Sequence, residues 1–171
     1  MPARGSVLTG AAGEDYVLYR LHLEGILAAQ SPSGAWAVDI IVFDPRMSVG
    51  SMLQVKTRTY GADGGWHMSE KHEREEFVHQ RLFYAFVDFE PESPVVYVVP
   101  SAVVADVLAK SHGAWLATPG RGGRSHRDTK MRRVIPAYGF PVPGYEPGWL
   151  DGYRERWDLL TSDPRLEGAE A

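Results

Sequence analysis

The chain has 171 residues, of which 44% are hydrophobic and 23% charged, a composition typical of one globular domain with a buried core. It contains no run of 18 apolar residues and no apolar signal-peptide core, so we expect no membrane segment. It has no cysteine, which excludes disulfides and thiolate metal sites and fits a cytoplasmic location. The net charge of −4 arises in residues 146–171, which hold 3 basic and 7 acidic residues, whereas residues 1–145 hold 15 of each. A local basic patch that binds a polyanion is therefore compatible with the overall charge.

The N-terminal part predicts a helix followed by a short strand. Apolar residues recur at spacings of three and four over residues 10–24, which is the helical period. Gly25 is well suited to end this helix, and residues 26–29 are expected to form a strand. We expect one domain over the whole chain, with residues 1–9 and 161–171 as flexible ends.

Two apolar runs, VDIIVFD and MLQVKTR, flank a turn rich in proline, glycine and serine, which is typical of a β-hairpin. Asp39, Gln54 and Lys56 interrupt these runs, and such polar groups are costly to bury without partners. If Asp44 pairs with Ser51, Asp39 faces Lys56 across the hairpin. Gln54 then shares their face, because side chains alternate along a strand, and the apolar residues line the opposite face.

Further elements follow from apolar runs and capping signals in the rest of the chain. We expect a loop over 60–66, a short helix over 70–79 with Ser69 as N-cap, strands over 81–89 and 95–99, a helix over 102–111 with Ser101 as cap, a loop over 119–133 and a closing helix over 149–160. This order predicts a single α/β domain with a central mixed β-sheet flanked by helices.

The polar residues of the hairpin suggest a metal site. Glu14 lies on the apolar stripe of the first helix, so its carboxylate is expected to face the sheet and Asp39. Mg²⁺ (or Mn²⁺) prefers oxygen ligands, which Glu14, Asp39, the Gln54 amide and the Val55 backbone carbonyl all offer. Lys56 beside them would lie near a scissile phosphate. Two simpler interpretations stay open: an acid favoured at a helix N-terminus for Glu14, and a solvated polar sheet face for the hairpin residues.

This pattern resembles the PD-(D/E)XK nuclease superfamily. Gly13-Glu14 in a first helix, SPSGAWAVDII and LQVKTR are similar to small archaeal Holliday-junction resolvases and to group I intron homing endonucleases with Gln in the motif. The resemblance covers roughly residues 10–60 and implies a restriction-endonuclease-like fold. It implies that Glu14, Asp39 and Gln54 bind the metal and that Lys56 is the catalytic lysine, in Mg²⁺-dependent hydrolysis of DNA. Val38 replaces the usual Pro before the aspartate, and Gln54 replaces the usual acid.

Cationic side chains cluster in the segment 119–133, where glycines make the chain pliable and only Asp128 opposes them. This segment is the strongest candidate for contacts with DNA phosphates, with a solvated surface loop as the alternative. The candidate DNA-binding residues, including two nearer the hairpin, are Arg58, Lys71, Arg121, Arg124, Arg127, Lys130, Arg132 and Arg133. Trp36, Trp66 and Trp115 are interpreted as packing residues that have the chemistry to stack on bases. We expect His67, His72 and His79 to lie on the surface.

Three functions remain in view from the sequence. The first is a metal-dependent DNA endonuclease, the second a catalytically weakened nucleic-acid-binding protein of the same fold, and the third a non-enzymatic assembly protein. Cutting both strands of DNA usually takes two active sites, so we expect a homodimer or a higher homo-oligomer. The apolar run over 81–89 and the segment over 149–160 are the candidate interfaces.

Overall fold

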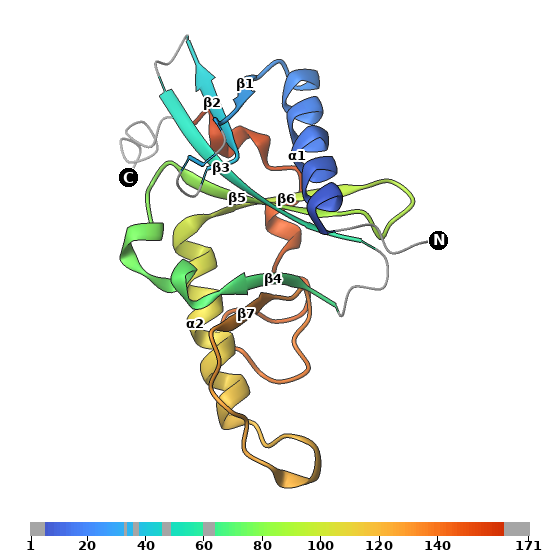
Figure 1. Cartoon of the computed structure of the whole chain (residues 1–171), viewed down its shortest axis with the longest axis vertical. Coiled ribbons are helices and arrows are strands. Elements are labelled where there is room, and N and C mark those ends of the chain that lie inside the picture. The colour runs from blue at the N-terminus through green and yellow to red at the C-terminus, as the bar shows by residue number, and fades with distance from the viewer. Residues whose placement is uncertain (1–5, 33, 36–37, 46–48, 60–63, 163–171) are drawn as a thin grey trace.

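A mixed five-stranded sheet forms the centre of the computed structural model, which describes residues 6–32, 34–35, 38–45, 49–59 and 64–162 (Figure 1). Its strands lie in the order β1-β2-β3-β5-β6. Only the central pair, β3 with β5, is parallel; the other pairs are antiparallel. The strands are β1 (Leu27–Gln30), β2 (Ile40–Asp44), β3 (Val49–Arg58), β5 (Leu82–Asp88) and β6 (Val95–Pro100). The predicted α/β class is confirmed.

Two hydrophobic cores lie on opposite faces of this sheet, because successive residues of β5 point to opposite sides. Phe83, Ala85 and Val87 join the core under helix α1 (Ser6–Leu23). Tyr84 and Phe86 join the second core, which contains residues of helix α2 (Ser101–Ala117). A second, two-stranded sheet of β4 (Trp66–Ser69) and β7 (Met131–Val134) covers this second face. The crossover between β3 and β5 holds β4 and two 3₁₀ helices, η1 (Glu70–Glu73) and η2 (Glu75–Phe77).

Several predicted elements differ from the structure. Helix α1 begins at Ser6, so residues 6–9 are helical, not flexible. The helix predicted over 70–79 is replaced by η1 and η2, and Ser69 makes no side-chain capping bond. The predicted loop over 119–133 ends in β7, whose partner β4 was not foreseen. Pro100, not Ser101, is the N-cap of α2; the Ser101 hydroxyl bonds the backbone of His79.

The closing helix predicted over 149–160 is also wrong. The segment forms two 3₁₀ turns, η4 (Asp151–Tyr153) and η5 (Trp157–Leu160). Tertiary contacts hold it: Trp157 is 4% exposed in the core under α1, and the Leu160 carbonyl accepts bonds from Ser51 and Arg81. Every residue of β5 is buried as well. The residues of β5, and Trp157 and Leu160 of the closing segment, are therefore buried within the chain itself.

Helix α1 lies against β3 at a glycine. A Cβ atom on Gly13 would overlap the hydroxyl of Thr57, so only glycine permits this approach. The contact places the middle of α1 beside the C-terminal half of β3. Helix α1 ends at Leu23, and Gly25 follows it with a φ of 71°, the left-handed conformation that glycine favours after a helix. This agrees with the predicted end of the helix. Among the described residues, no helix is long and apolar enough to cross a membrane.

We predict that Gly13→Ala lowers the free energy of unfolding by about 1–3 kcal/mol, because the added methyl group overpacks the contact with Thr57. Gly10→Ala is the matched control: a Cβ there meets no atom within 4 Å, so the higher helix propensity of alanine should raise stability by about 0.5–1 kcal/mol. Urea unfolding of the two variants measures both values. Equal effects at both positions would contradict the close packing of α1 on β3.

Candidate active site

Asp39 is fixed at the point where β2 begins. Its backbone N–H donates to the Leu53 carbonyl at 2.8 Å, and its carboxylate accepts a hydrogen bond from the Val55 N–H at 2.7 Å. In a strand, the N–H and C=O of one residue point to the same side, so the Val55 carbonyl also faces the Asp39 side. The Asp39 carboxylate and the Val55 carbonyl therefore lie on the same side of β3, at the start of β2.

The hairpin register differs from the predicted one by two residues. Asp44 pairs with Val49 and Ile40 pairs with Leu53, so continuing the ladder puts Gln54, not Lys56, opposite Asp39. A shift of two leaves each side chain on its predicted face. Leu53 and Val55 accordingly lie in the core under α1, and Gln54 and Lys56 point to the other face.

Gln54 is buried, at 7% exposure, beside Tyr84 of β5. Its carbonyl oxygen Oε1 is buried and makes no hydrogen bond with the described residues. A buried amide oxygen without a partner costs free energy, typically about 1–3 kcal/mol. Ser31 Oγ and Thr57 Oγ1 are buried without a partner in the same way, but of these oxygens only Gln54 Oε1 belongs to a residue of the predicted metal site.

Glu14 reaches this cluster from α1. Because α1 begins at Ser6, Glu14 lies in the middle of the helix, and the first turn holds no acid. This excludes the interpretation of Glu14 as an N-terminal acid favoured by the helix dipole. Burial and the nearby Asp39 carboxylate raise the pKa of Glu14, while Lys56 opposes that rise. By contrast, its neighbour Asp15 is exposed and accepts a hydrogen bond from Gln30.

Lys56 is half-buried, and burial lowers the pKa of its ammonium group. The Asp39 and Glu14 carboxylates act in the opposite direction, and Lys71 adds to the lowering. The net direction means that desolvation outweighs the attraction of the two carboxylates. An ammonium group that is partly removed from water interacts more strongly with an anion that enters the site, because the local dielectric constant is lower.

A buried histidine lies beside this cluster and was not foreseen. His72, in η1, is 3% exposed, and its Nδ1 lies 2.8 Å from the Tyr84 hydroxyl. Burial, together with Lys56 and Lys71, lowers the pKa of His72 to about 4. The prediction of a surface histidine is wrong here, whereas His67 and His79 are exposed. No local pattern marks His72, because its burial comes from the fold of the β3–β5 crossover.

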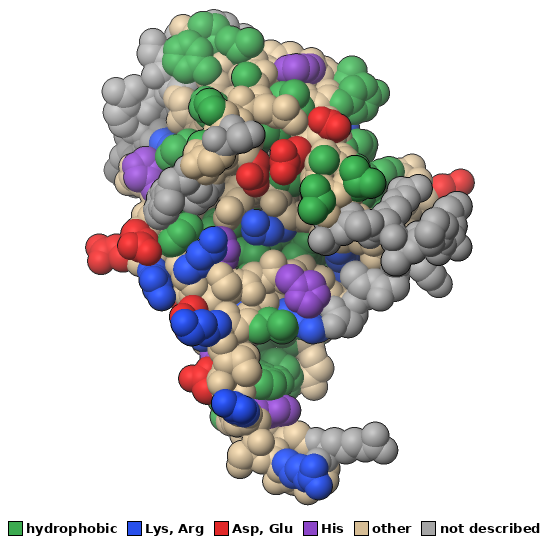
Figure 2. Space-filling view, in the orientation of Figure 1, with side chains coloured by type: hydrophobic (Ala, Val, Ile, Leu, Met, Phe, Trp, Pro, Cys, Tyr) green, Lys and Arg blue, Asp and Glu red, His purple; other side chains and the backbone are tan. Residues whose placement is uncertain are grey.

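The candidate DNA-binding residues fall into two groups. Lys71, Arg124, Arg127 and Lys130 are exposed, and Arg133 is partly exposed. Figure 2 shows Lys and Arg side chains gathered on the lower half of one face, over β4, β7 and the tip after α2. The side chain of Arg121 and the whole of Trp36 lie outside the described residues.

Arg58 and Arg132 are instead engaged within the protein. The Arg58 guanidinium bonds Asp88 at 2.6 Å and lies over the Trp66 ring. Arg132 is 8% exposed and pairs with Glu73 of η1. These contacts join β3 to β5 and β7 to η1, so we leave both arginines out of the proposed DNA surface.

Comparison with known proteins defines the fold class. No family model and no curated protein matches the chain. Among solved structures, the chain is similar to a bacterial homing endonuclease, I-Ssp6803I, with 15% sequence identity and a TM-score of 0.51 over 91% of each chain. At this identity the likeness establishes a shared fold. The protein thus has a restriction-endonuclease-like α/β fold.

The donor set fits a hard divalent cation with few protein ligands. It comprises the carboxylates of Glu14 and Asp39, the unpartnered Gln54 Oε1 and the Val55 carbonyl. The described residues contain no group of three His, Asp or Glu side chains able to hold a metal. Mg²⁺ commonly takes one or two carboxylates and keeps several waters, so two acids and an amide suit Mg²⁺ better than a transition metal.

The low pKa of His72 makes stability depend on pH. Unfolded His72 binds a proton below about pH 6.5, whereas folded His72 stays neutral down to about pH 4. The unfolded state therefore binds more protons between these values, and stability falls as the pH drops through this window, by up to about 2–3 kcal/mol. We predict that His72→Gln flattens this dependence, measured as urea unfolding across the window. His67→Gln, at an exposed position, is the control and should retain it; an unchanged slope in His72→Gln would contradict the prediction.

Proposed function

We propose that the protein is a metal-dependent DNA endonuclease of the PD-(D/E)XK superfamily. The observation that carries this proposal is the buried, unpartnered Gln54 Oε1, on the strand whose Val55 N–H holds the Asp39 carboxylate. The mutual electrostatic effects of Glu14, Asp39 and Lys56 support the proposal, and so does the fold shared with a homing endonuclease. A solvated sheet face does not fit Gln54, which is 7% exposed.

We assign Glu14, Asp39, Gln54 and the Val55 carbonyl as the residues that would hold Mg²⁺ or Mn²⁺. When bound, such an ion polarises the phosphodiester and makes water a stronger nucleophile. The two carboxylates attract the cation, and the neutral amide adds an oxygen without a third negative charge. Burial and repulsion from the Asp39 carboxylate raise the pKa of Glu14. A cation bound at the site would offset this repulsion.

Lys56 supplies positive charge to the scissile phosphate. It projects from β3 on the same face as Gln54, and its amine is coupled to both carboxylates. Because it is partly desolvated, its field on the phosphate is stronger than that of an exposed lysine. The charge that develops on the phosphate oxygens during hydrolysis is thereby stabilised by a group already in place.

DNA is the proposed partner. The exposed residues Lys71, Arg124, Arg127 and Lys130 offer phosphate contacts. Figure 2 shows Lys and Arg side chains gathered on one face of the molecule. One site cuts one strand, so cleavage of a duplex calls for two copies of the chain, and a two-fold homodimer is the commonest arrangement. A catalytically weakened DNA-binding protein is the second candidate, since Gln54 leaves the site with two acids only.

We predict that the protein nicks supercoiled plasmid or branched DNA with Mg²⁺ or Mn²⁺, and that EDTA abolishes the activity. Lys56→Ala should lower the initial rate at least about 100-fold, because it removes a preorganised charge from the transition state. Lys110→Ala is the matched control, since Lys110 is an exposed lysine on α2 paired with Asp106 at 2.7 Å. Gel assays of initial rate measure the effect.

The outcomes separate the three functions. Metal-dependent cutting that Lys56→Ala loses and Lys110→Ala keeps supports the endonuclease. Salt-sensitive DNA binding without cutting contradicts the enzyme and favours the weakened DNA-binding protein. If the protein neither binds nor cuts DNA, the non-enzymatic assembly protein is the function that remains.

The cationic segment generates a separate prediction about salt. Replacing Arg124 and Arg127 together by alanine removes two phosphate contacts, so the slope of log Kobs against log salt should become shallower by about 2. Arg156→Ala is the control, because this exposed arginine pairs with Asp158 at 2.8 Å beside η5. Fluorescence anisotropy at several salt concentrations gives the slopes. An unchanged slope in the double variant would remove this segment from the DNA surface.

A further inference from the structure

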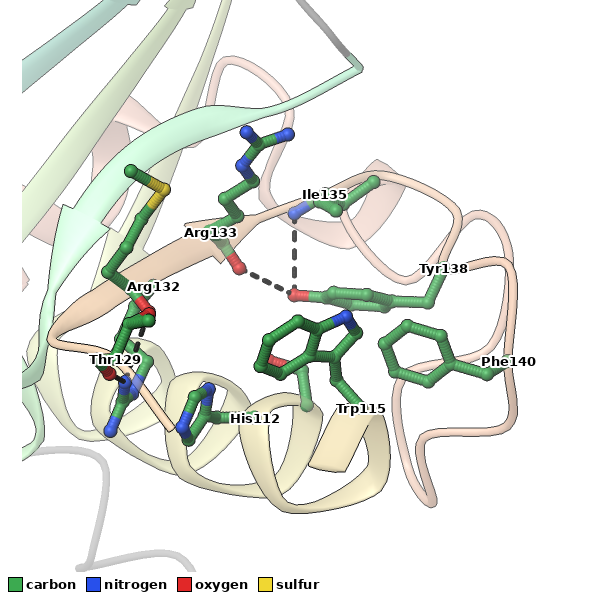
Figure 3. A pocket seen from close by; sticks show the side chains of 10 residues that line it. His112, Trp115, Thr129, Arg132, Arg133, Ile135, Tyr138 and Phe140 are labelled. Carbon is green, nitrogen blue, oxygen red and sulfur yellow. Dashed lines mark hydrogen bonds between the residues drawn. The ribbon is translucent and has the colours of Figure 1, made fainter. Parts of the chain in front are cut away.

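A cavity of about 430 Å³ lies between α2, β7 and the loop that follows β7. Three large aromatic side chains line it: Trp115 comes from the last turns of α2, and Tyr138 and Phe140 come from the loop (Figure 3). His112, Thr129 and Arg132 line it as well. The volume lies within the range of small-molecule sites, which is about 300–1,000 Å³. The proposed hydrolysis uses none of these residues.

The aromatic walls are held in place by contacts of their own. The Trp115 ring stacks on His126, with ring centroids 4.1 Å apart, and His126 is not part of the cavity lining. The His112 ring lies beside Trp115, with centroids 5.5 Å apart, and lines the cavity as well. The Tyr138 hydroxyl donates to the Arg133 carbonyl at 3.2 Å and accepts from the Ile135 N–H at 3.3 Å. A wall fixed in this way loses little conformational freedom when a flat ring stacks on it.

Basic residues lie on the cavity wall and in the segment next to it. Arg133 lines the cavity. The segment between α2 and β7, which contributes Thr129 to the lining, also carries the exposed Arg124, Arg127 and Lys130. Asp128, the acid of this segment, is occupied by His112 at 2.8 Å. Aromatic side chains with basic residues on the wall and in the adjoining segment complement a ligand that is a flat ring attached to a phosphate chain, and such a ligand is a nucleotide within a strand.

The cavity is also linked to the candidate active site. Arg132, on the cavity wall, pairs with Glu73 at the end of η1. The same short helix carries Lys71, which lowers the pKa of Lys56, and His72, whose pKa Lys56 lowers. Helix η1 therefore contacts the cavity wall and interacts with the candidate active site, so one DNA molecule that reaches η1 is near both places.

We propose that this cavity binds an unpaired nucleobase of DNA, stacked on Trp115. The inference rests on DNA being the partner and goes further, since it assigns a preference for DNA that contains an unstacked base. A base inside a paired duplex is stacked on both sides and cannot enter, whereas a bulged, mismatched or single-stranded base enters at little cost.

The test compares two DNA duplexes that differ by one unpaired adenine, with binding measured by anisotropy in EDTA so that no strand is cut. The protein should bind the bulged duplex roughly 5- to 100-fold more tightly, which is the range of base stacking on an aromatic side chain. Trp115→Ala should abolish this ratio, and Trp115→Phe, which keeps an aromatic face, should retain most of it. Arg124→Ala is the control: it should weaken both duplexes alike and leave the ratio unchanged.

Equal binding of the two duplexes by the unmodified protein overturns the proposal, and so does a preference that persists in folded Trp115→Ala. Phe140→Ala, which removes another wall of the cavity, decides the question if circular dichroism shows that Trp115→Ala is unfolded. Binding and cutting of paired DNA without any preference defeats the cavity proposal alone. Failure to bind either duplex defeats the proposed DNA function together with it.

Discussion

The close approach of α1 to β3 at Gly13 is the constraint on which the candidate site depends. The hairpin alone brings together Asp39, Gln54 and Lys56, which include a single acid. Glu14 joins them only because Gly13 leaves no side chain between the helix and Thr57. The two residues Gly13-Glu14 therefore have complementary roles. Gly13 allows α1 to lie close to β3, and this closeness brings the Glu14 carboxylate near Asp39. Without that approach the site would hold too little negative charge for a divalent cation.

The groups gathered there are in mutual conflict while no cation is bound. Glu14 and Asp39 repel one another, Lys56 is desolvated, and Gln54 Oε1 is buried without a partner. Each feature lowers the stability of the fold, and we propose that a bound cation and an anionic substrate relieve or use each of them. Natural proteins concentrate such local violations at functional sites, where stability is exchanged for preorganisation. The surrounding structure is otherwise consistent, with two apolar cores on the faces of one sheet.

Local signals predicted the strands of the sheet and the sheet face of Gln54 and Lys56; the role of these residues in a site stays a prediction. Apolar runs marked β5 and β6, and alternation placed Gln54 and Lys56 on one face, because these properties belong to the strand itself. The register of the hairpin was wrong by two residues because it depends on the turn, and residues 46–48 of that turn lie outside the described part. The pairing of β4 with β7, the burial of His72 and the irregular closing segment all arise from contacts between distant residues. No short pattern in the sequence encodes them.

The position of a bound cation tests the central claim most directly. We propose a crystal structure of the protein soaked with Mn²⁺, with the ion located by its anomalous scattering. The account predicts one peak in contact with the Asp39 carboxylate and Gln54 Oε1, at the oxygen–metal distance of about 2.0–2.2 Å expected for a small hard cation, with Glu14 directed at the same ion. A well-occupied ion elsewhere, or an empty site in which Gln54 Oε1 keeps no partner at saturating Mn²⁺, would contradict it.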